Sequence, residues 1–451
     1  MAKKILFISL GCDKNRVDSE RMLGVLSGRD YCVTDQESDA DVVVVNTCCF
    51  IDEAKEESIQ TILEMARLKE TGSCKALIVA GCLSERYREE IFRELPEVDA
   101  IVGAHSYGHI AEAIEAACEG RRERWLDPPG ALLKKEPSRV LTTGGFFAYL
   151  KIAEGCDRHC TYCVIPSVRG PYHSVPIEAL LDEARKLAAG GVRELILVAQ
   201  DTARYGTDLY GERRLHVLLE ELCRIEELRW IRVLYVYPEE LYPELIDAIA
   251  REKKICKYLD LPIQHSEDDI LKRMGRRMTG ERLREIVTGL RKKIPGIALR
   301  TTLISGFPGE TEEEHQALLG FVREMRFDRL GVFAYSREEG TPAAGMPDQI
   351  PEQVRNARRE ELLLCQQEIA EETNQDLIGR TFEVFIEGFM PEEDVWVGRT
   401  YRDAPDVDSL FFIRCEQELH TGDLVHALAT EAGTYDLIGE LRDEDSDESA
   451  E

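Results

Sequence analysis

The chain has 451 residues, of which 43% are apolar, and its 57 basic and 86 acidic residues give a formal net charge of −29. This length predicts about two to four domains with hydrophobic cores, and the acidic balance argues against a nucleic-acid-binding surface over the whole protein. Fourteen cysteines are too few for a disulfide scaffold, and no apolar run approaches the ~20 residues of a membrane span, so we expect a cytoplasmic protein with reduced thiols and no membrane partner.

The first 130 residues alternate short apolar runs with amphipathic stretches, which predicts an α/β domain built on an open parallel sheet. Short, wholly apolar runs are typical of strands that are buried on both faces of such a sheet. We predict strands and helices in this N-terminal domain, residues 1–130, at Ile5–Leu10, Asp41–Val45, Ala76–Ala80, Asp52–Lys69 and Ser84–Glu94.

A cysteine follows each of the three predicted strands. Cys12, Cys48 and Cys82 are far apart in the chain, but ligands of open α/β sheets bind where the carboxyl ends of the strands meet. The three thiols can therefore converge on one metal centre, or they can be small buried side chains, as free cysteines often are. Cys49 could replace Cys48, whereas Cys74 precedes its strand and lies at the wrong edge.

The middle of the chain predicts a second α/β domain. Residues 127–147 contain the turn-forming runs Asp-Pro-Pro-Gly and Thr-Thr-Gly-Gly, and we place a linker at 131–147. Six strands alternating with helices over residues 148–378 predict a partial TIM-like (β/α)6 barrel, followed by a charged helix from Pro351 to Gln375. The strands are predicted at Ala148–Ala153, Glu194–Ala199, Trp230–Val236, Tyr258–Ile263, Ala298–Ile304 and Gly331–Tyr335.

Three cysteines follow the first strand of this barrel, at the face where such barrels carry their active sites. Cys156, Cys160 and Cys163 have the spacing Cys-x3-Cys-x2-Cys. A 4Fe-4S cluster normally takes four cysteines, so three leave one iron open to a ligand from outside the protein. The alternative is a structural zinc, with His159 or His173 as the fourth ligand. The spacing after a strand resembles the radical S-adenosylmethionine (SAM) superfamily.

That resemblance implies SAM and substrate sites at other strand ends. Tyr162 matches the aromatic residue beside the adenine, although it could be a core aromatic. The glutamine and aspartate after the second strand could instead cap the next segment, and the histidine after the fourth could be a loop residue. The implied cofactor-binding residues are Tyr162, Gln200, Asp201 and Gly306, and the implied substrate residues are Gln264 and His265.

A basic group stands out in this acidic chain. It consists of Lys272, Arg273, Arg276 and Arg277. A solvated helix face is the common explanation for such a run, and an anchor for a carboxylate or a phosphate is the sharper one.

The C-terminal region changes to short β-type runs separated by turn residues. Five strands over residues 379–442 predict a small all-β, OB-like barrel, and residues 443–451 form an acidic tail that we expect to be disordered. The strands are predicted at Phe382–Glu387, Val395–Tyr401, Leu410–Ile413, Leu424–Ala429 and Tyr435–Leu441.

The order of the three parts resembles the methylthiotransferase family over essentially the whole chain. The resemblance implies an auxiliary 4Fe-4S cluster on Cys12, Cys48 and Cys82, a radical SAM cluster on Cys156, Cys160 and Cys163, and a C-terminal TRAM domain that recognises the substrate. It implies that reductive cleavage of SAM yields a 5′-deoxyadenosyl radical, which removes hydrogen from a C–H bond, and that the product is C–S–CH3. No side chain is assigned a catalytic role beyond the clusters.

The family has one branch that modifies an adenosine of tRNA and one that modifies an aspartate of ribosomal protein S-twelve. From Arg380 to Glu451 the chain has five arginines, no lysine and twenty acidic residues, which would repel an RNA backbone and attract a basic protein. The run from Trp396 to Asp408 also resembles the S-twelve branch. We therefore expect the S-twelve protein or the small ribosomal subunit as partner, with an electron donor such as flavodoxin or ferredoxin and a sulfur donor.

Two other classes of protein would share some of these features. An electron-transfer protein with two clusters would not need a SAM-binding barrel, and a ribosome-associated binding module would hold zinc in place of iron and sulfide.

Overall fold

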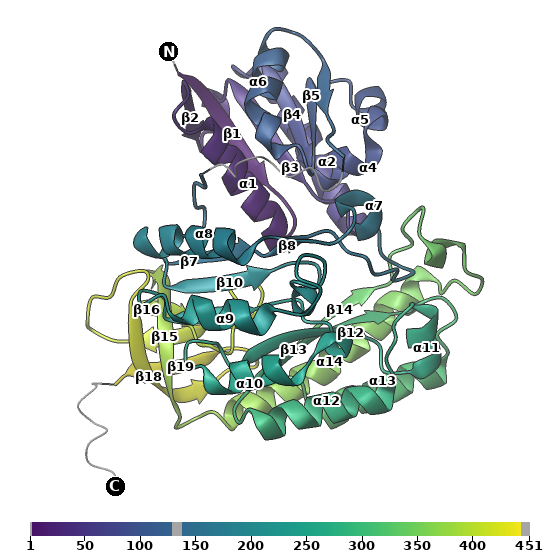
Figure 1. The fold of residues 1–451 in the computed structure, drawn as a ribbon, viewed down its shortest axis with the longest axis vertical. Coiled ribbons are helices and arrows are strands. Elements are labelled where there is room, and N and C mark those ends of the chain that lie inside the picture. Colours follow the sequence, from purple (N-terminus) through teal and green to yellow (C-terminus); the bar gives the residue numbers. More distant parts are fainter. Residues whose placement is uncertain (1, 129–137, 443–451) are drawn as a thin grey trace.

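The computed structural model describes residues 2–128 and 138–442, which form three parts (Figure 1). The first is a six-stranded, all-parallel sheet in the order β2-β1-β3-β4-β5-β6. Its strands are β1 (Lys3–Ser9), β2 (Tyr31–Thr34), β3 (Val42–Thr47), β4 (Ala76–Gly81), β5 (Ala100–Gly103) and β6 (Glu123–Trp125). Its helices are α1 (Asp13–Leu26), α2 (Asp52–Ala66), α3 (Leu68–Thr71), α4 (Cys82–Tyr87), α5 (Glu89–Glu94) and α6 (Ile110–Cys118).

Both faces of this sheet are covered. Met22 of α1 and Ile114 of α6 pack on one face, and Ile62 of α2 and Leu83 of α4 pack on the other. This sandwich confirms the three predicted strands, because β3 and β4 are buried along their whole length. Strands β2, β5 and β6 were not predicted, and the helix expected over 84–94 is broken at Arg88, which has a left-handed backbone (φ 39°).

The second part is an open barrel of six strands. Strands β7, β10 and β11 pair in parallel in the order β11-β10-β7, and β12, β13 and β14 pair in parallel in that order. The two sheets meet where the Val236 amide donates to the Asp260 carbonyl, at 2.9 Å. The strands are β7 (Phe147–Lys151), β10 (Glu194–Val198), β11 (Trp230–Val233), β12 (Tyr258–Gln264), β13 (Ala298–Ser305) and β14 (Arg329–Ala334).

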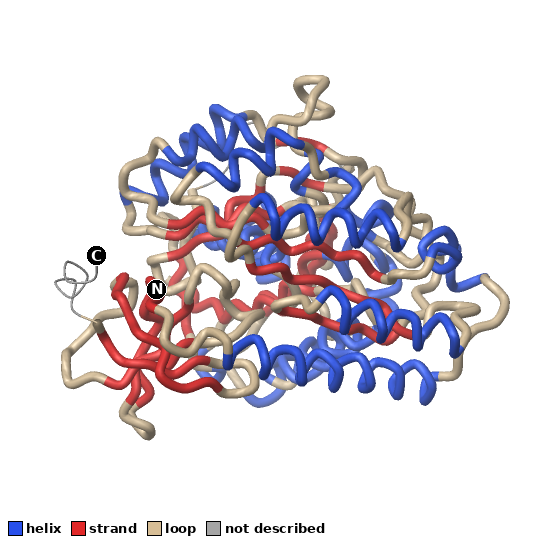
Figure 2. The backbone as a smooth tube through the Cα atoms, turned by 90° about the horizontal axis from the view of Figure 1, so that it is seen from below, coloured by secondary structure: helices blue, strands red, loops and turns tan. Residues whose placement is uncertain are grey.

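Helices cover the outside of this barrel, and Figure 2 shows its strands as a layer flanked by them. They are α8 (Ile177–Ala189), α9 (Leu215–Cys223), α10 (Pro243–Arg251), α11 (Asp268–Arg273), α12 (Gly280–Lys293), α13 (Glu312–Met325) and α14 (Glu352–Gln375). Each of the six predicted strands is present. Between β7 and α8 lie the short strands β8 (Ala153–Glu154) and β9 (His173–Ser174) and the helix α7 (Ile165–Arg169), which Figure 1 places next to α4.

The third part is a closed five-stranded barrel in the order β15-β16-β17-β19-β18. Neighbouring strands are antiparallel except for β17 and β19. The strands are β15 (Thr381–Met390), β16 (Val395–Arg399), β17 (Phe411–Arg414), β18 (Leu424–Ala432) and β19 (Leu437–Leu441). The predicted fold class is confirmed in all three parts, and the acidic tail lies outside the described residues.

Buried ion pairs join the C-terminal barrel to the (β/α)6 barrel. Glu194 of β10 accepts from Arg399 of β16 at 2.7 Å and from Arg232 of β11 at 2.8 Å, and all three side chains are at most 1% exposed. We call this set, together with the pairs Arg329–Asp403, Arg402–Asp328 and Arg300–Asp408, the ionic joint. Most charged side chains in the run from Trp396 to Asp408 are therefore paired inside the protein.

No helix within the described ranges is long and apolar enough to cross a lipid bilayer.

Candidate functional site

The three barrel cysteines lie in the loop between β8 and α7, at the carboxyl end of β7. Backbone bonds from the Cys156 amide to the Gly170 carbonyl (3.0 Å) and from the Cys163 amide to the Cys160 carbonyl (3.1 Å) fold the loop on itself. Gly155 has φ 76°, and a Cβ there would lie 2.1 Å from the Pro171 carbonyl oxygen, so only glycine fits. Burial raises the pKa of Cys156 to about 11 and also raises that of Cys163, which lies near the other two thiols. These two thiols need a nearby positive charge to ionise.

The three N-terminal cysteines lie at the carboxyl ends of their strands. Cys12 precedes α1, Cys48 follows β3, and Cys82 begins α4. A Cβ on Gly11 would lie 3.1 Å from the Cys48 sulfur, so the segment carrying Cys12 packs directly on Cys48. Burial raises the pKa of Cys82, and the other thiols of the set lie close enough to raise it further. Cys49 also contributes, so the choice between it and Cys48 stays a prediction.

Asn15 holds these cysteine-bearing segments together. It is fully buried, its amide nitrogen donates to the carbonyls of Leu10 (3.0 Å) and Thr47 (2.9 Å), and its oxygen lies 3.6 Å from the Cys82 sulfur. Nothing in the sequence singled Asn15 out.

Soft sulfur donors in sets of three fit the family's iron–sulfur clusters. Among the described residues, no group of three or more Cys, His, Asp and Glu side chains stands in a finished metal-binding geometry. The ligand sets are therefore carried forward as proposals.

Arg169, at the end of the helix α7 that follows the barrel cysteines, contacts a thiol of the N-terminal set. Its Nε donates to the Cys82 sulfur at 3.3 Å, and its Nη1 donates to Asp18 at 2.7 Å and to Glu154 at 3.2 Å. Lys151 binds the same two carboxylates. Burial opposes ionisation of Glu154, but the charges of Lys151 and Arg169 lower its pKa far below the usual range. Sequence reasoning missed this cluster, because its members come from two domains.

Three predicted cofactor residues lie near the barrel thiols. Tyr162 packs edge-on against Phe307, with ring centroids 6.5 Å apart. The Gln200 amide nitrogen donates to Glu154 at 3.2 Å, and the Arg158 Nε donates to Asp201 at 3.1 Å. One side-chain oxygen of Gln200 and one of Asp201 are buried without a partner. Burial raises the pKa of Asp201 to about 6. These oxygens can accept hydrogen bonds from a ligand.

The other predicted residues are more enclosed. Gly306 has φ 69°, and the space beside it is filled by Arg355, whose Cγ would lie 2.3 Å from an added Cβ. Gln264 has φ 72° at an irregularity of β12. His265 is fully buried, its Nδ1 accepts from the Glu267 amide at 3.0 Å, and burial lowers its pKa to about 3, which keeps it neutral.

The basic group does not act as one surface. Arg273 donates to the Pro308 carbonyl, and Arg277 is exposed. Arg276 is buried over the ring of Tyr237, at 4.2 Å, and its Nη2 donates to Glu239 at 3.1 Å. Its Nε and Nη1 have no partner, so the solvated-face interpretation is wrong for this residue.

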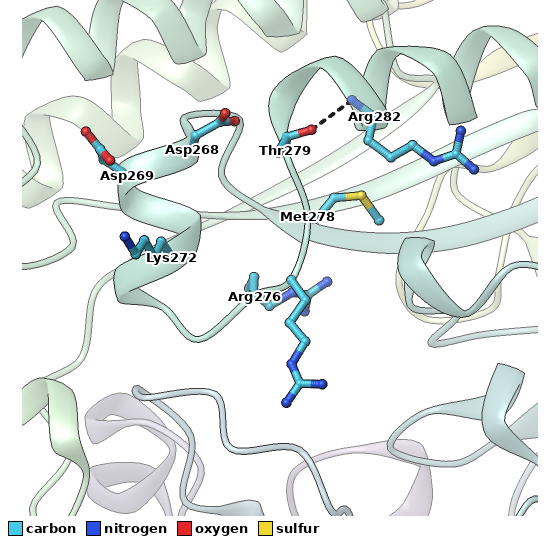
Figure 3. A pocket seen from close by; sticks show the side chains of 8 residues that line it. Asp268, Asp269, Lys272, Arg276, Met278, Thr279 and Arg282 are labelled. Carbon is cyan, nitrogen blue, oxygen red and sulfur yellow. Dashed lines mark hydrogen bonds between the residues drawn. The ribbon is translucent and has the colours of Figure 1, made fainter.

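Arg276 lines a pocket of about 520 Å³ between α11 and the start of α12 (Figure 3). Lys272 of α11 and Arg282 of α12 also line it, while Asp268 and Asp269 contribute opposite charge. Desolvation opposes the charged form of Arg276, but nearby Tyr162, Glu239 and Cys160 are among the groups that raise its pKa. An anionic group would satisfy its free N–H groups.

Comparison with known proteins finds a family match in each of the three parts of the chain. Family models match residues 4–103 (uncharacterized protein family UPF0004), 150–322 (radical SAM superfamily) and 378–441 (TRAM domain). A ribosomal protein uS12 methylthiotransferase RimO from Lachnoclostridium phytofermentans is 56% identical over 436 residues, 97% of this chain and 99% of that protein. The protein of the same name from Geobacter sulfurreducens is 50% identical over 441 residues, 97% of this chain and 98% of that protein.

Solved structures show a related fold at low identity. The radical S-adenosylmethionine methyltransferase TsrM from Kitasatospora setae, with cobalamin and a [4Fe-4S] cluster bound, has a TM-score of 0.54 at 15% identity, covering 76% of this chain and 77% of that one. The cobalamin-dependent S-adenosylmethionine radical enzyme OxsB has a TM-score of 0.53 at 12% identity, covering 82% and 56%.

Proposed function

The chain belongs to the RimO family of ribosomal protein uS12 methylthiotransferases, and from this premise we propose that it converts a C–H bond at the β-carbon of an aspartate of uS12 into C–S–CH3. One observation carries the proposal: the segment that bears the barrel thiols also contacts, through Arg169, a thiol of the N-terminal set. MiaB-like methylthiolation of a tRNA adenosine is not favoured, because relatives over nearly the full length carry the uS12 name.

In this proposal the two thiol sets hold two 4Fe-4S clusters: Cys156, Cys160 and Cys163 the radical SAM cluster, and Cys12, Cys48 and Cys82 the auxiliary cluster. When bound, these clusters and SAM supply the radical that removes hydrogen and the sulfur and methyl group that replace it. The protein contributes two sets of three cysteines, of which all but Cys12 are buried or partly buried.

Tyr162, Gln200, Asp201 and Gly306 are proposed to contact SAM. The unpartnered oxygens of Gln200 and Asp201 support this role, because the ammonium and ribose hydroxyl groups of SAM are donors. Gln264 and His265 are proposed to face the substrate. The roles of Gly306 and His265 have less support. Arg355 fills the space beside Gly306, and the Glu267 amide already donates to His265.

The C-terminal barrel is proposed to meet uS12. Glu392, Glu393 and Asp394 are exposed on the turn between β15 and β16, where they can attract a basic protein and repel an RNA backbone. The ionic joint contributes little to this field, because its charges are paired and, apart from that of Arg300, buried. The reaction further requires an electron donor such as flavodoxin or ferredoxin, a sulfur donor, and a compartment such as the cytoplasm where thiols stay reduced.

A competition tests the substrate. Reconstituted enzyme with reductant and excess SAM is offered uS12 and unmodified tRNA together, and mass spectrometry should find the methylthio group on an aspartate of the protein. Because the Debye length is ~8 Å at physiological ionic strength, added salt should slow the reaction with uS12. A methylthio group on a tRNA adenosine would replace the proposal with the MiaB-like one.

A further inference from the structure

The Arg169 guanidinium divides its hydrogen bonds between ordinary carboxylate partners and a sulfur atom. The side chain is 2% exposed. Its Nη1 serves Asp18 and Glu154, its Nη2 serves the Asn15 oxygen, and its Nε is aimed at the Cys82 sulfur at 3.3 Å. A buried cation that only balanced charge would need no sulfur contact.

Charge balance in this cluster does not depend on Arg169 alone. Lys151 bonds Asp18 and, at 2.7 Å, Glu154. Both carboxylates therefore keep one cationic partner if the guanidinium is removed. This separates the contact with Cys82 from the general need to neutralise buried carboxylates.

The sulfur contact also crosses a domain boundary. Cys82 begins α4 of the N-terminal sheet domain, while Arg169 ends α7 of the barrel. Helix α7 starts two residues after Cys163, so a short helix connects the barrel cysteines to Arg169. Asn15, which binds Arg169, also ties Leu10 and Thr47 next to the other two N-terminal cysteines.

Hydrogen bonds to cluster sulfurs and nearby positive charge favour the reduced state of an iron–sulfur centre. We propose that Arg169 is a positioning residue that acts from the barrel: it holds Cys82 in its ligand orientation and raises the reduction potential of the auxiliary centre. This inference rests on the proposed function only for the presence of that centre, and not for the identity of the substrate.

The test uses the full-length chain with Cys156, Cys160 and Cys163 changed to Ala, so that only the auxiliary centre is reconstituted. The midpoint potential is measured by a redox titration followed by electron paramagnetic resonance. Arg169→Gln removes both the charge and the Nε donor, and the potential should shift to a lower value. Arg169→Lys keeps the charge, and its shift should be smaller.

Lys151→Gln is the matched control. It removes a cation from the same two carboxylates and leaves the guanidinium–sulfur contact, so it should shift the potential less than Arg169→Gln. If Arg169→Gln fails to fold, the double variant Arg169→Gln/Asp18→Asn restores the charge balance and takes its place. Iron content and melting temperature are recorded for each protein.

The proposal is overturned if Arg169→Gln keeps its iron and has the parent's midpoint potential, or if Lys151→Gln shifts the potential equally. Loss of auxiliary iron in Arg169→Gln but not in Lys151→Gln supports the orienting role. Because potential and iron content are read without uS12, a failure of the uS12 assignment leaves these outcomes unchanged.

Discussion

Single residues in this protein divide into satisfied and unsatisfied buried charges. Glu194 and its two arginines meet one another completely. Near the barrel thiols, Asp201 and Arg276 each keep buried polar atoms without a partner. Since leaving a buried polar group unpaired is costly, these atoms near the cysteine loop are suited to a polar ligand.

Arg276 provides a prediction at this scale. Arg276→Met should weaken SAM binding to the reconstituted enzyme by roughly 10- to 100-fold, since hydrogen bonds to charged groups contribute about 1.5–3 kcal/mol. The fold should survive, because Glu239 keeps Arg158 as a partner. Calorimetric titration with SAM measures the change, and Arg277→Met, on the exposed neighbour, serves as control. Equal affinities in parent and Arg276→Met would contradict a contact between Arg276 and SAM.

At the scale of elements, regular strands were predictable and local breaks were not. Strands β3 and β4 can be recognised in the sequence as apolar runs, because both of their faces are buried. The edge strand β2 is partly exposed, and β6 has only three residues, so neither gives a clear pattern. The candidate ligand cysteines could be predicted from their positions directly after strands. Asn15 and Arg169 did not, because their partners lie on segments that only the folded chain brings together.

The two cysteine-bearing elements should be separable. Changing Cys156, Cys160 and Cys163 to Ala should leave about half of the parent's iron and abolish SAM cleavage, because the auxiliary thiols belong to another sheet. Changing Cys12, Cys48 and Cys82 should spare SAM cleavage and eliminate methylthiolated product. Iron analysis and product chromatography read both results. Undiminished iron in the first variant, or product from the second, would contradict the ligand sets.

At the scale of the whole molecule, the ionic joint connects the two barrels. Burial alone would raise the pKa of Glu194, but the charges of Arg399 and Arg232 lower it below the usual value. A lowered carboxyl pKa stabilises the fold above the unfolded pKa of about 4.3, and that stabilisation is lost as the pH falls through the folded value.

Glu194→Gln should therefore cost about 3–5 kcal/mol at pH 7, because it leaves the buried Arg232 without its carboxylate partner, and the difference from the parent should shrink as the pH falls below about 4. Calorimetric unfolding across this pH range measures both. Glu387→Gln changes a more exposed partner of Arg399 and should cost less. A pH-independent difference for Glu194→Gln would contradict the linkage.

The ionic joint holds the C-terminal barrel in one position against the (β/α)6 barrel. A protein bound at the turn between β15 and β16 must place its target residue at a fixed distance from this turn to reach the cysteine loop. The C-terminal barrel cannot move to shorten that distance. Selection of one aspartate among many then depends partly on its distance from the docking surface of the substrate. Shortening or lengthening the substrate between its docking surface and its target should move the modification or abolish it, even where the sequence around the target is untouched.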